Sequence, residues 1–217
     1  MTYFYGLMTA LWLCCVSFSA NGQESSNLQW HGYFSQGITQ SIDSDFITSD
    51  NQISAELTEI GLNGLYQVAS NISIAGQVVY LDGGNRFEQG SRLDYLFIDW
   101  TVDDIAGWQA QIHLGRYKNS HWLYSVTRDV PQTRDTAVLP QSVYFDGFRD
   151  VALGSNGIQT RFSKYTDNHV WEVNWSYGRS TINEEQRDYL LGSLALGEIK
   201  QDFVHQFSVF WQPASMN

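Results

Sequence analysis

The residues with the greatest potential for chemistry lie in one long connection, residues 116–150. Hairpin connections usually have about 2–5 residues, and a loop as long as this one is commonly either functional or disordered. Its aromatic side chains and interleaved opposite charges favour an ordered loop, because disordered segments tend to lack aromatics. The charged candidates are Arg116, Lys118, Arg128, Asp129, Arg134, Asp135, Asp146 and Arg149.

These charges admit two interpretations. Rings of charged side chains are one way in which pores select ions and small solutes, so the loop is a candidate constriction across a passage. In the alternative interpretation, the charges pair with one another and only hold the loop in shape.

A second set of candidates lies on predicted strands beside this connection. Apolar and polar residues alternate from Trp108 to Gly115, and the same period recurs from His169 to Arg179. A period of two places the two sets of side chains on opposite faces of a strand. The polar sets predict a lumen-facing surface that includes Gln109, Gln111, His113, Glu172 and Asn174.

Similar patterns predict eight strands in all, over residues 28–41, 56–66, 72–81, 93–102, 108–115, 151–164, 169–179 and 203–212. The connections between them are alternately long and short. Long loops at one end and short turns at the other are typical of an outer-membrane β-barrel. Strands of about ten residues also match the 9–11 residues that cross a bilayer at a tilt. Part of the long connection after residue 179, residues 189–196, is a candidate for a helical turn.

The composition limits the functions that are compatible with this chain. The net charge is -11 and the pI is near 4.6, which argues against nucleic acid as a partner, because such binding relies on basic contacts to phosphate. Aromatics make up 15% of the chain although its mean hydropathy is only -0.28. This combination is expected where aromatic girdles flank alternating strands. The girdle or core candidates are Trp30, Trp100, Trp108, Trp171, Trp175 and Trp211.

The first residues have the features of an export signal. An apolar segment from Tyr3 to Phe18 precedes the first charged residue, Glu24, and small residues follow it. This predicts a signal peptide over residues 1–22 and one domain over residues 23–217. Both cysteines, Cys14 and Cys15, would leave with the signal. A mature chain without cysteine excludes a disulfide scaffold and thiolate chemistry, and it fits the bacterial envelope.

Catalytic, metal and cofactor sites find little support in the sequence. The five histidines are scattered without metal-ligand spacing, and no phosphate-binding or dinucleotide fingerprint is present. The adjacent Ser120 and His121 suggest a hydrolase, but no Gly-x-Ser-x-Gly motif accompanies them. A soluble β-sandwich that acts on sugars through Asp146 and Asp150 is a further enzyme alternative. We therefore expect a protein that is not an enzyme and that binds no metal or cofactor.

Three stretches resemble a group of proteobacterial porin-like outer-membrane proteins. They are residues 28–37 (LQWHGYFSQG), residues 91–100 (SRLDYLFIDW) and residues 114–150, whose Leu-Gly-Arg, Thr-Arg-Asp-Val and Leu-Pro-Gln-Ser-x-Tyr-Phe-Asp patterns carry most of the likeness. The resemblance covers most of the mature chain and implies an outer-membrane barrel with a diffusion or uptake role. It implies no catalytic residue. Members are typically longer and end on an aromatic residue, whereas this chain ends Pro-Ala-Ser-Met-Asn.

The sequence thus predicts an all-β, antiparallel transmembrane β-barrel of about eight strands, or the N-terminal part of a larger barrel. The expected function is porin-like passage of small polar solutes across the bacterial outer membrane, controlled by the loop at residues 116–150. The expected partners are outer-membrane lipid, lipopolysaccharide and small polar solutes, and self-association into a homo-oligomer stays open. The alternatives are a non-conducting barrel that binds surface partners, and an outer-membrane or secreted hydrolase.

Overall fold

Eight antiparallel strands form one sheet in which each strand pairs with its neighbours in the sequence. The computed structural model describes residues 27–49, 51–86, 89–121, 131–133, 136, 154–182, 184–192 and 197–213. The strands are β1 (Leu28–Gln40), β2 (Ile53–Ala69), β3 (Ile72–Asp82), β4 (Gly90–Ile105), β5 (Trp108–Lys118), β6 (Gly154–Tyr165), β7 (His169–Arg179) and β8 (Val204–Pro213). The predicted all-β, eight-stranded antiparallel sheet is confirmed, and the predicted signal peptide lies outside the described residues.

The connections alternate in length as predicted. Short turns join β2 to β3, β4 to β5 and β6 to β7, and long connections join the remaining consecutive pairs. Because neighbouring strands run in opposite directions, all short turns lie at one end of the sheet and all long connections at the other. At the long-connection end, the segment after β1 packs on the 3-10 helix Gly84–Arg86, where Asn85 N donates to Ile47 O at 2.8 Å.

β2 and β4 extend beyond their predicted ranges at both ends, and β5 extends beyond its predicted end to Lys118. β2 has 17 residues and β4 has 16, because each is paired along both edges, beyond the stretch in which its own alternation is regular. Pairing with neighbours extends a strand even where its local sequence is polar.

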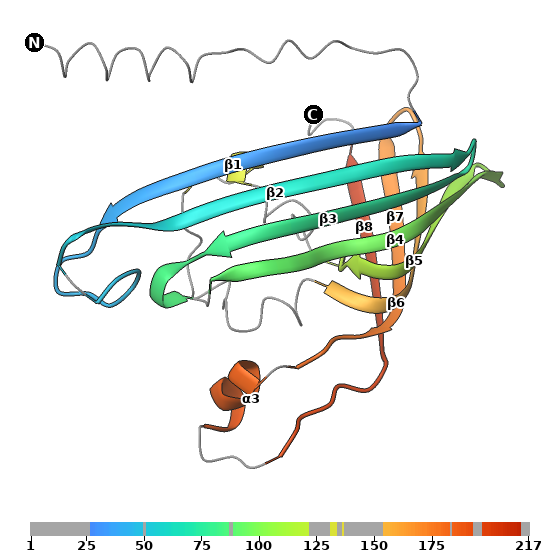
Figure 1. Cartoon of the computed structure of the whole chain (residues 1–217). Helices are drawn as coiled ribbons and strands as arrows, with labels where there is room; N and C mark the ends of the chain where they lie inside the picture. The colour runs from blue at the N-terminus through green and yellow to red at the C-terminus, as the bar shows by residue number, and fades with distance from the viewer. Residues whose placement is uncertain are drawn as a thin grey trace, which may run out of the picture.

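The sheet is strongly curved, and β5–β8 turn away from β1–β4 (Figure 1). The seven pairings run from β1–β2 to β7–β8, and none of the described pairings joins β1 to β8. These two strands are therefore the edges of the sheet, and closure into a barrel is not detected among the described residues.

A transverse row of glycines crosses the region where the sheet curves. Gly115, Gly157 and Gly178 are register partners on β5, β6 and β7. A Cβ at residue 157 would lie 2.2 Å from Tyr177 O, and a Cβ at residue 178 would lie 2.5 Å from the Tyr117 hydroxyl. The absence of side chains in this row allows the strands to bend and allows Tyr117 to lie across them.

The two faces of the sheet have opposite character. One face carries large apolar side chains that are mostly exposed, for example Trp30 (69%), Phe34 (68%) and Phe207 (67%). The other face carries polar side chains that are buried, including Asn174 (0%) and Ser176 (1%). Since the polar side chains are the shielded ones, the polar face lies on the inside of the curve. This distribution is the reverse of that in a soluble β-sheet protein.

An apolar core is nearly absent from the described residues. Their buried hydrophobic side chains are Ile47, Val79, Leu81, Ala110 and Tyr117. A soluble β-sandwich packs two sheets over such a core, whereas this chain forms a single sheet.

The one described α-helix, α3 (Glu184–Leu191), lies in the connection between β7 and β8, and no helix of the described part is long and apolar enough to cross a membrane. The helical turn was predicted over residues 189–196, so α3 begins five residues earlier and shares only residues 189–191 with the prediction. Gly192 follows the helix, and its N–H donates to Asp188 O at 2.8 Å.

We predict that Gly157→Ala destabilises the sheet. The added Cβ would meet backbone atoms, Tyr177 O at 2.2 Å and Gly178 Cα at 2.7 Å, so the strands must separate to accept it. Overpacking of this kind typically costs about 1–3 kcal/mol, and the midpoint of urea unfolding of the refolded protein should fall accordingly.

Gly64→Ala is the matched control for that measurement. It is also a strand glycine, but its added Cβ would be in ordinary contact, 3.8 Å from Gln29 O. Equal unfolding midpoints for the two variants would contradict the predicted clash at residue 157.

Candidate functional site

The strand register places polar residues in transverse rows on the inner face. One row consists of Ser73, Asp99, His113, Gln159, Ser176 and Gln206 on β3–β8. The next consists of Thr101, Gln111, Arg161, Asn174 and Ser208 on β4–β8. All five residues predicted to face a lumen lie on this face, since Gln109 and Glu172 belong to a third row through Ser163. That the face lines a lumen stays a prediction.

His113 is held on three sides within its row. Its Nε2 lies 3.2 Å from Asp99 Oδ1, and its Nδ1 lies 3.3 Å from Gln159 Oε1. Its ring stacks on Phe97 with a centroid distance of 4.3 Å. These contacts fix the orientation of the imidazole between a carboxylate and an amide.

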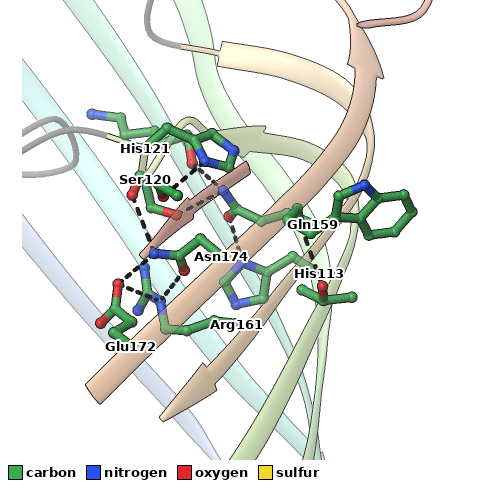
Figure 2. Close-up of polar contacts among 11 residues, drawn as sticks. His113, Ser120, His121, Gln159, Arg161, Glu172 and Asn174 are labelled. Atoms are coloured by element: carbon green, nitrogen blue, oxygen red, sulfur yellow. Dashed lines mark hydrogen bonds and ion pairs between the residues drawn. The ribbon is translucent and has the colours of Figure 1, made fainter. Parts of the chain in front are cut away.

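Arg161, Glu172 and Asn174 form a charged cluster between β6 and β7 (Figure 2). Arg161 Nε donates to Asn174 Oδ1 at 3.3 Å and lies 3.6 Å from Glu172 Oε1. Asn174 Nδ2 in turn donates to Glu172 Oε1 at 2.6 Å. Arg161 and Glu172 are partly exposed on the inner face, so both signs of charge are accessible from that side.

The first residues after β5 fold back onto the inner face. We call Asn119, Ser120 and His121 the docked segment. Gln159 Nε2 donates to Ser120 Oγ at 2.9 Å, and Asn174 Nδ2 donates to Ser120 O at 3.4 Å. As Figure 2 shows, this segment lies directly over the side chains of β6 and β7.

The His121 ring is the most firmly bonded part of the docked segment. Its Nε2 lies 2.7 Å from Ser176 Oγ on β7, and its Nδ1 lies 3.0 Å from Ser208 Oγ on β8. The docked segment also covers Asn174, Ser176 and Gln159, each of which is 2% exposed or less. Buried polar groups are stable when they are hydrogen-bonded, and here the long connection supplies the bonds. Burial lowers the pKa of His121.

The contact between His121 and Ser176 differs from a hydrolytic dyad. In such a site one ring nitrogen activates the serine while the other is oriented by a carboxylate. Here Ser208 occupies the second nitrogen, and Ser176 is buried where no substrate can reach its hydroxyl. Ser120, the serine that suggested a hydrolase in the sequence, bonds to Gln159 instead of to His121. These contacts anchor the long connection to the sheet.

Arg116 and Lys118 were predicted to lie in the long connection, but β5 continues to Lys118, so both are strand residues, and their side chains contact β4. Lys118 Nζ lies 2.6 Å from Asp94 Oδ2, and Arg116 Nε donates to the Asp94 main-chain oxygen at 3.3 Å. Asp94 is the residue at which the β3–β4 register shifts. Asp94 belongs to β4 and not to the long connection, so these contacts do not show the loop charges pairing with one another, and that interpretation stays a prediction.

The other six charged candidates, Arg128, Asp129, Arg134, Asp135, Asp146 and Arg149, lie outside the described residues, as does Asp150. In the described part of the chain, no group of three or more His, Cys, Asp or Glu side chains is arranged to hold a metal ion.

Gln159 and Ser208 were not singled out from the sequence, whereas Ser176 belongs to the polar set that was predicted to face a lumen. Gln159, Ser176 and Ser208 lie in the alternating polar sets of their strands, which is the only signal that points to them. Their importance comes from contact with the docked segment, 39, 55 and 87 residues away respectively along the chain. Comparison of the chain with protein-family models, curated proteins and solved structures found no match.

We predict that acid releases the docked segment. Because the His121 pKa is lowered by burial, the docked form binds a proton less readily than the released form. Docking is therefore fully stable above the ordinary histidine pKa of about 6.5, and its equilibrium constant falls by up to about tenfold per pH unit below it. The measurement is the labelling rate of a cysteine at the buried position 119, relative to an exposed cysteine at position 198.

His121→Gln is the control, because glutamine can still donate and accept hydrogen bonds but does not titrate in this range. Its relative labelling rate should not change between pH 7 and pH 5. An equal rise in the variant and in the parent would mean that another group causes the release.

Proposed function

We propose that this chain forms the wall of a porin-like β-barrel in the bacterial outer membrane, through which small polar solutes pass passively. The start of the long connection narrows the passage. The observation that carries the proposal is the reversed polarity of the sheet, with apolar side chains exposed outward and polar side chains buried inward. Transmembrane barrels have this arrangement because lipid surrounds them and water fills them.

The outer face has the properties required for contact with lipid. It is apolar over successive strands, and register partners such as Trp171 and Trp211 place aromatic side chains near the short-turn end. Aromatic rings at the level of the headgroups are typical of such walls. The proposed lipid partners are those of the outer membrane, including lipopolysaccharide, which the predicted export signal would allow the chain to reach.

The inner face has the properties required for contact with water and solutes. Its amides, hydroxyls and charges of both signs can replace part of the hydration of a small polar molecule. Arg161 and Glu172 lie 3.6 Å apart there, so they create a local transverse field. No residue of the face is arranged to break a covalent bond in the contacts described, which favours passage over catalysis.

We predict that the mature chain conducts ions in planar lipid bilayers and that the charge pair sets its selectivity. Arg161→Gln removes a positive charge and should shift the reversal potential in a KCl gradient toward cations. Glu172→Gln should shift it toward anions. A unit charge about 7 Å from a passing ion in water contributes roughly 0.6 kcal/mol, or about a two- to threefold change in permeability ratio.

Lys200→Gln is the control variant, because the Lys200 side chain is 81% exposed and lies beside Glu198 in the connection before β8. It should leave the reversal potential unchanged. If neither Arg161→Gln nor Glu172→Gln changes the reversal potential, the passage does not run beside these residues. Failure of the chain to insert into the bilayer would refute the proposal.

One observation favours a second candidate, a barrel that does not conduct. The docked segment fills space over β6–β8 and leaves Asn174 and Ser176 buried. If the segment acts as a plug, the parent chain should insert without conducting, and Ser176→Ala, which removes one anchor of His121, should open it.

A further inference from the structure

We propose that two copies of this chain close one barrel together, with β1 of each copy pairing with β8 of the other. Two eight-stranded sheets would give a wall of sixteen strands around one shared lumen. This inference rests on the proposed membrane location, because unpaired edges can persist in water but not in lipid. A second copy of the chain is then the partner of both edge strands.

The directions of the two edges are compatible with this closure. In a meander of eight antiparallel strands, the first and last strands run in opposite directions. β1 begins and β8 ends at the short-turn end of the sheet. A rotation by half a turn about the barrel axis therefore brings β8 of one copy beside β1 of the other as an antiparallel pair, with all long connections still on one side of the membrane.

The backbone groups at the β1 edge can be assigned from one hydrogen bond. Gln67 N donates to Asn27 O at 2.6 Å, and the β1–β2 register makes residues 27 and 67 partners. Because hydrogen-bonded and non-hydrogen-bonded pairs alternate, the odd-numbered residues of β1 bond to β2 near this end. Even-numbered residues such as Trp30 and Phe34 turn their N–H and C=O groups toward the free edge.

The same reasoning assigns the β8 edge. Thr166 N donates to His169 O at 2.9 Å, so odd-numbered β7 residues bond to β6 and even-numbered ones bond to β8. The register pairs these with even-numbered β8 residues. The odd-numbered residues, Phe207, Val209 and Trp211, therefore turn their backbone groups toward the free edge.

At both edges the free backbone groups thus belong to residues whose apolar side chains point outward and are exposed. An antiparallel pair of β1 and β8 can then satisfy its hydrogen bonds and keep one continuous apolar exterior at the same time. A mismatch in either property would have forced polar side chains into the lipid, because a slip of one residue exchanges the two faces of a strand.

The docked segment favours a second copy over closure of a single chain. An eight-stranded barrel has an interior just wide enough for its own side chains, whereas barrels of 16–18 strands contain an aqueous channel. Here a piece of main chain, Asn119 to His121, already lies on the inner face and bonds to side chains of β6, β7 and β8. A wider barrel provides space for this segment beside the passage.

Cysteine cross-linking tests the proposal on the full chain. Cys14 and Cys15 are the only cysteines in the sequence, so Cys14→Ala and Cys15→Ala provide a clean background. Two differently tagged chains, one with Gln29→Cys on β1 and one with Phe210→Cys on β8, are produced together. Both positions face inward and belong to the non-hydrogen-bonded set, whose Cα atoms lie about 4.5 Å apart in an antiparallel pair, within disulfide range. His31→Cys replaces Gln29→Cys to sample a register shifted by two residues.

We expect a disulfide-linked dimer that carries both tags on a non-reducing gel. Asn63→Cys with Phe210→Cys is the control, because Asn63 faces the same side but lies on β2, one strand from the edge, and it should not cross-link. A double variant, Gln29→Cys with Phe210→Cys in one chain, that cross-links only at monomer mass would overturn the proposal in favour of a closed eight-stranded barrel.

Absence of any cross-link in either register, within a chain or between chains, would also overturn it, because the edges would then have other partners. Membrane insertion is measured in parallel, from the difference in gel mobility before and after boiling. Insertion without a mixed dimer defeats this inference alone, whereas failure to insert defeats the proposed function as well.

Discussion

The antiparallel register decides the environment of every side chain in the sheet. A slip of one residue in any of the seven strand pairs would exchange its faces, moving groups such as Asn174 and Ser176 outward and residues such as Trp171 inward. The same register determines which backbone groups bond within the sheet and which remain at its edges. Side-chain polarity, the docked segment and the free edges are therefore consequences of one set of pairings.

The inner face is stabilised by hydrogen bonds instead of apolar packing. A buried amide or hydroxyl without a partner costs roughly 1–3 kcal/mol, so the docked segment and the sheet depend on each other. Gln159 and Ser176 are satisfied by the segment, and the segment is ordered by them. The outer face contributes little cohesion of its own, because its apolar side chains are mostly exposed.

Much of the sheet could be predicted from the sequence, because a period of two is a local signal. Trp108 to Gly115 and His169 to Arg179 were correctly predicted as strands, and the alternation of short and long connections was also predicted correctly. The contacts of the site were less accessible, because His121 meets Ser208 across 87 residues and no local pattern encodes that distance. The position of the helix was predicted incorrectly, because Glu184–Leu191 is short and only weakly amphipathic. Ion pairing of Lys118 with Asp94 depended on a register shift in β4 that alternation alone does not reveal.

The contact between Tyr117 and Gly178 has a consequence for sequence divergence. The phenol hydroxyl lies only 2.5 Å from where a Cβ of residue 178 would be, so the two residues share one volume. A larger residue at position 178 is tolerable only when residue 117 becomes smaller. The two positions are 61 residues apart in the chain, yet they should co-vary during evolution, and this pair would be a useful marker for recognising distant relatives of the fold.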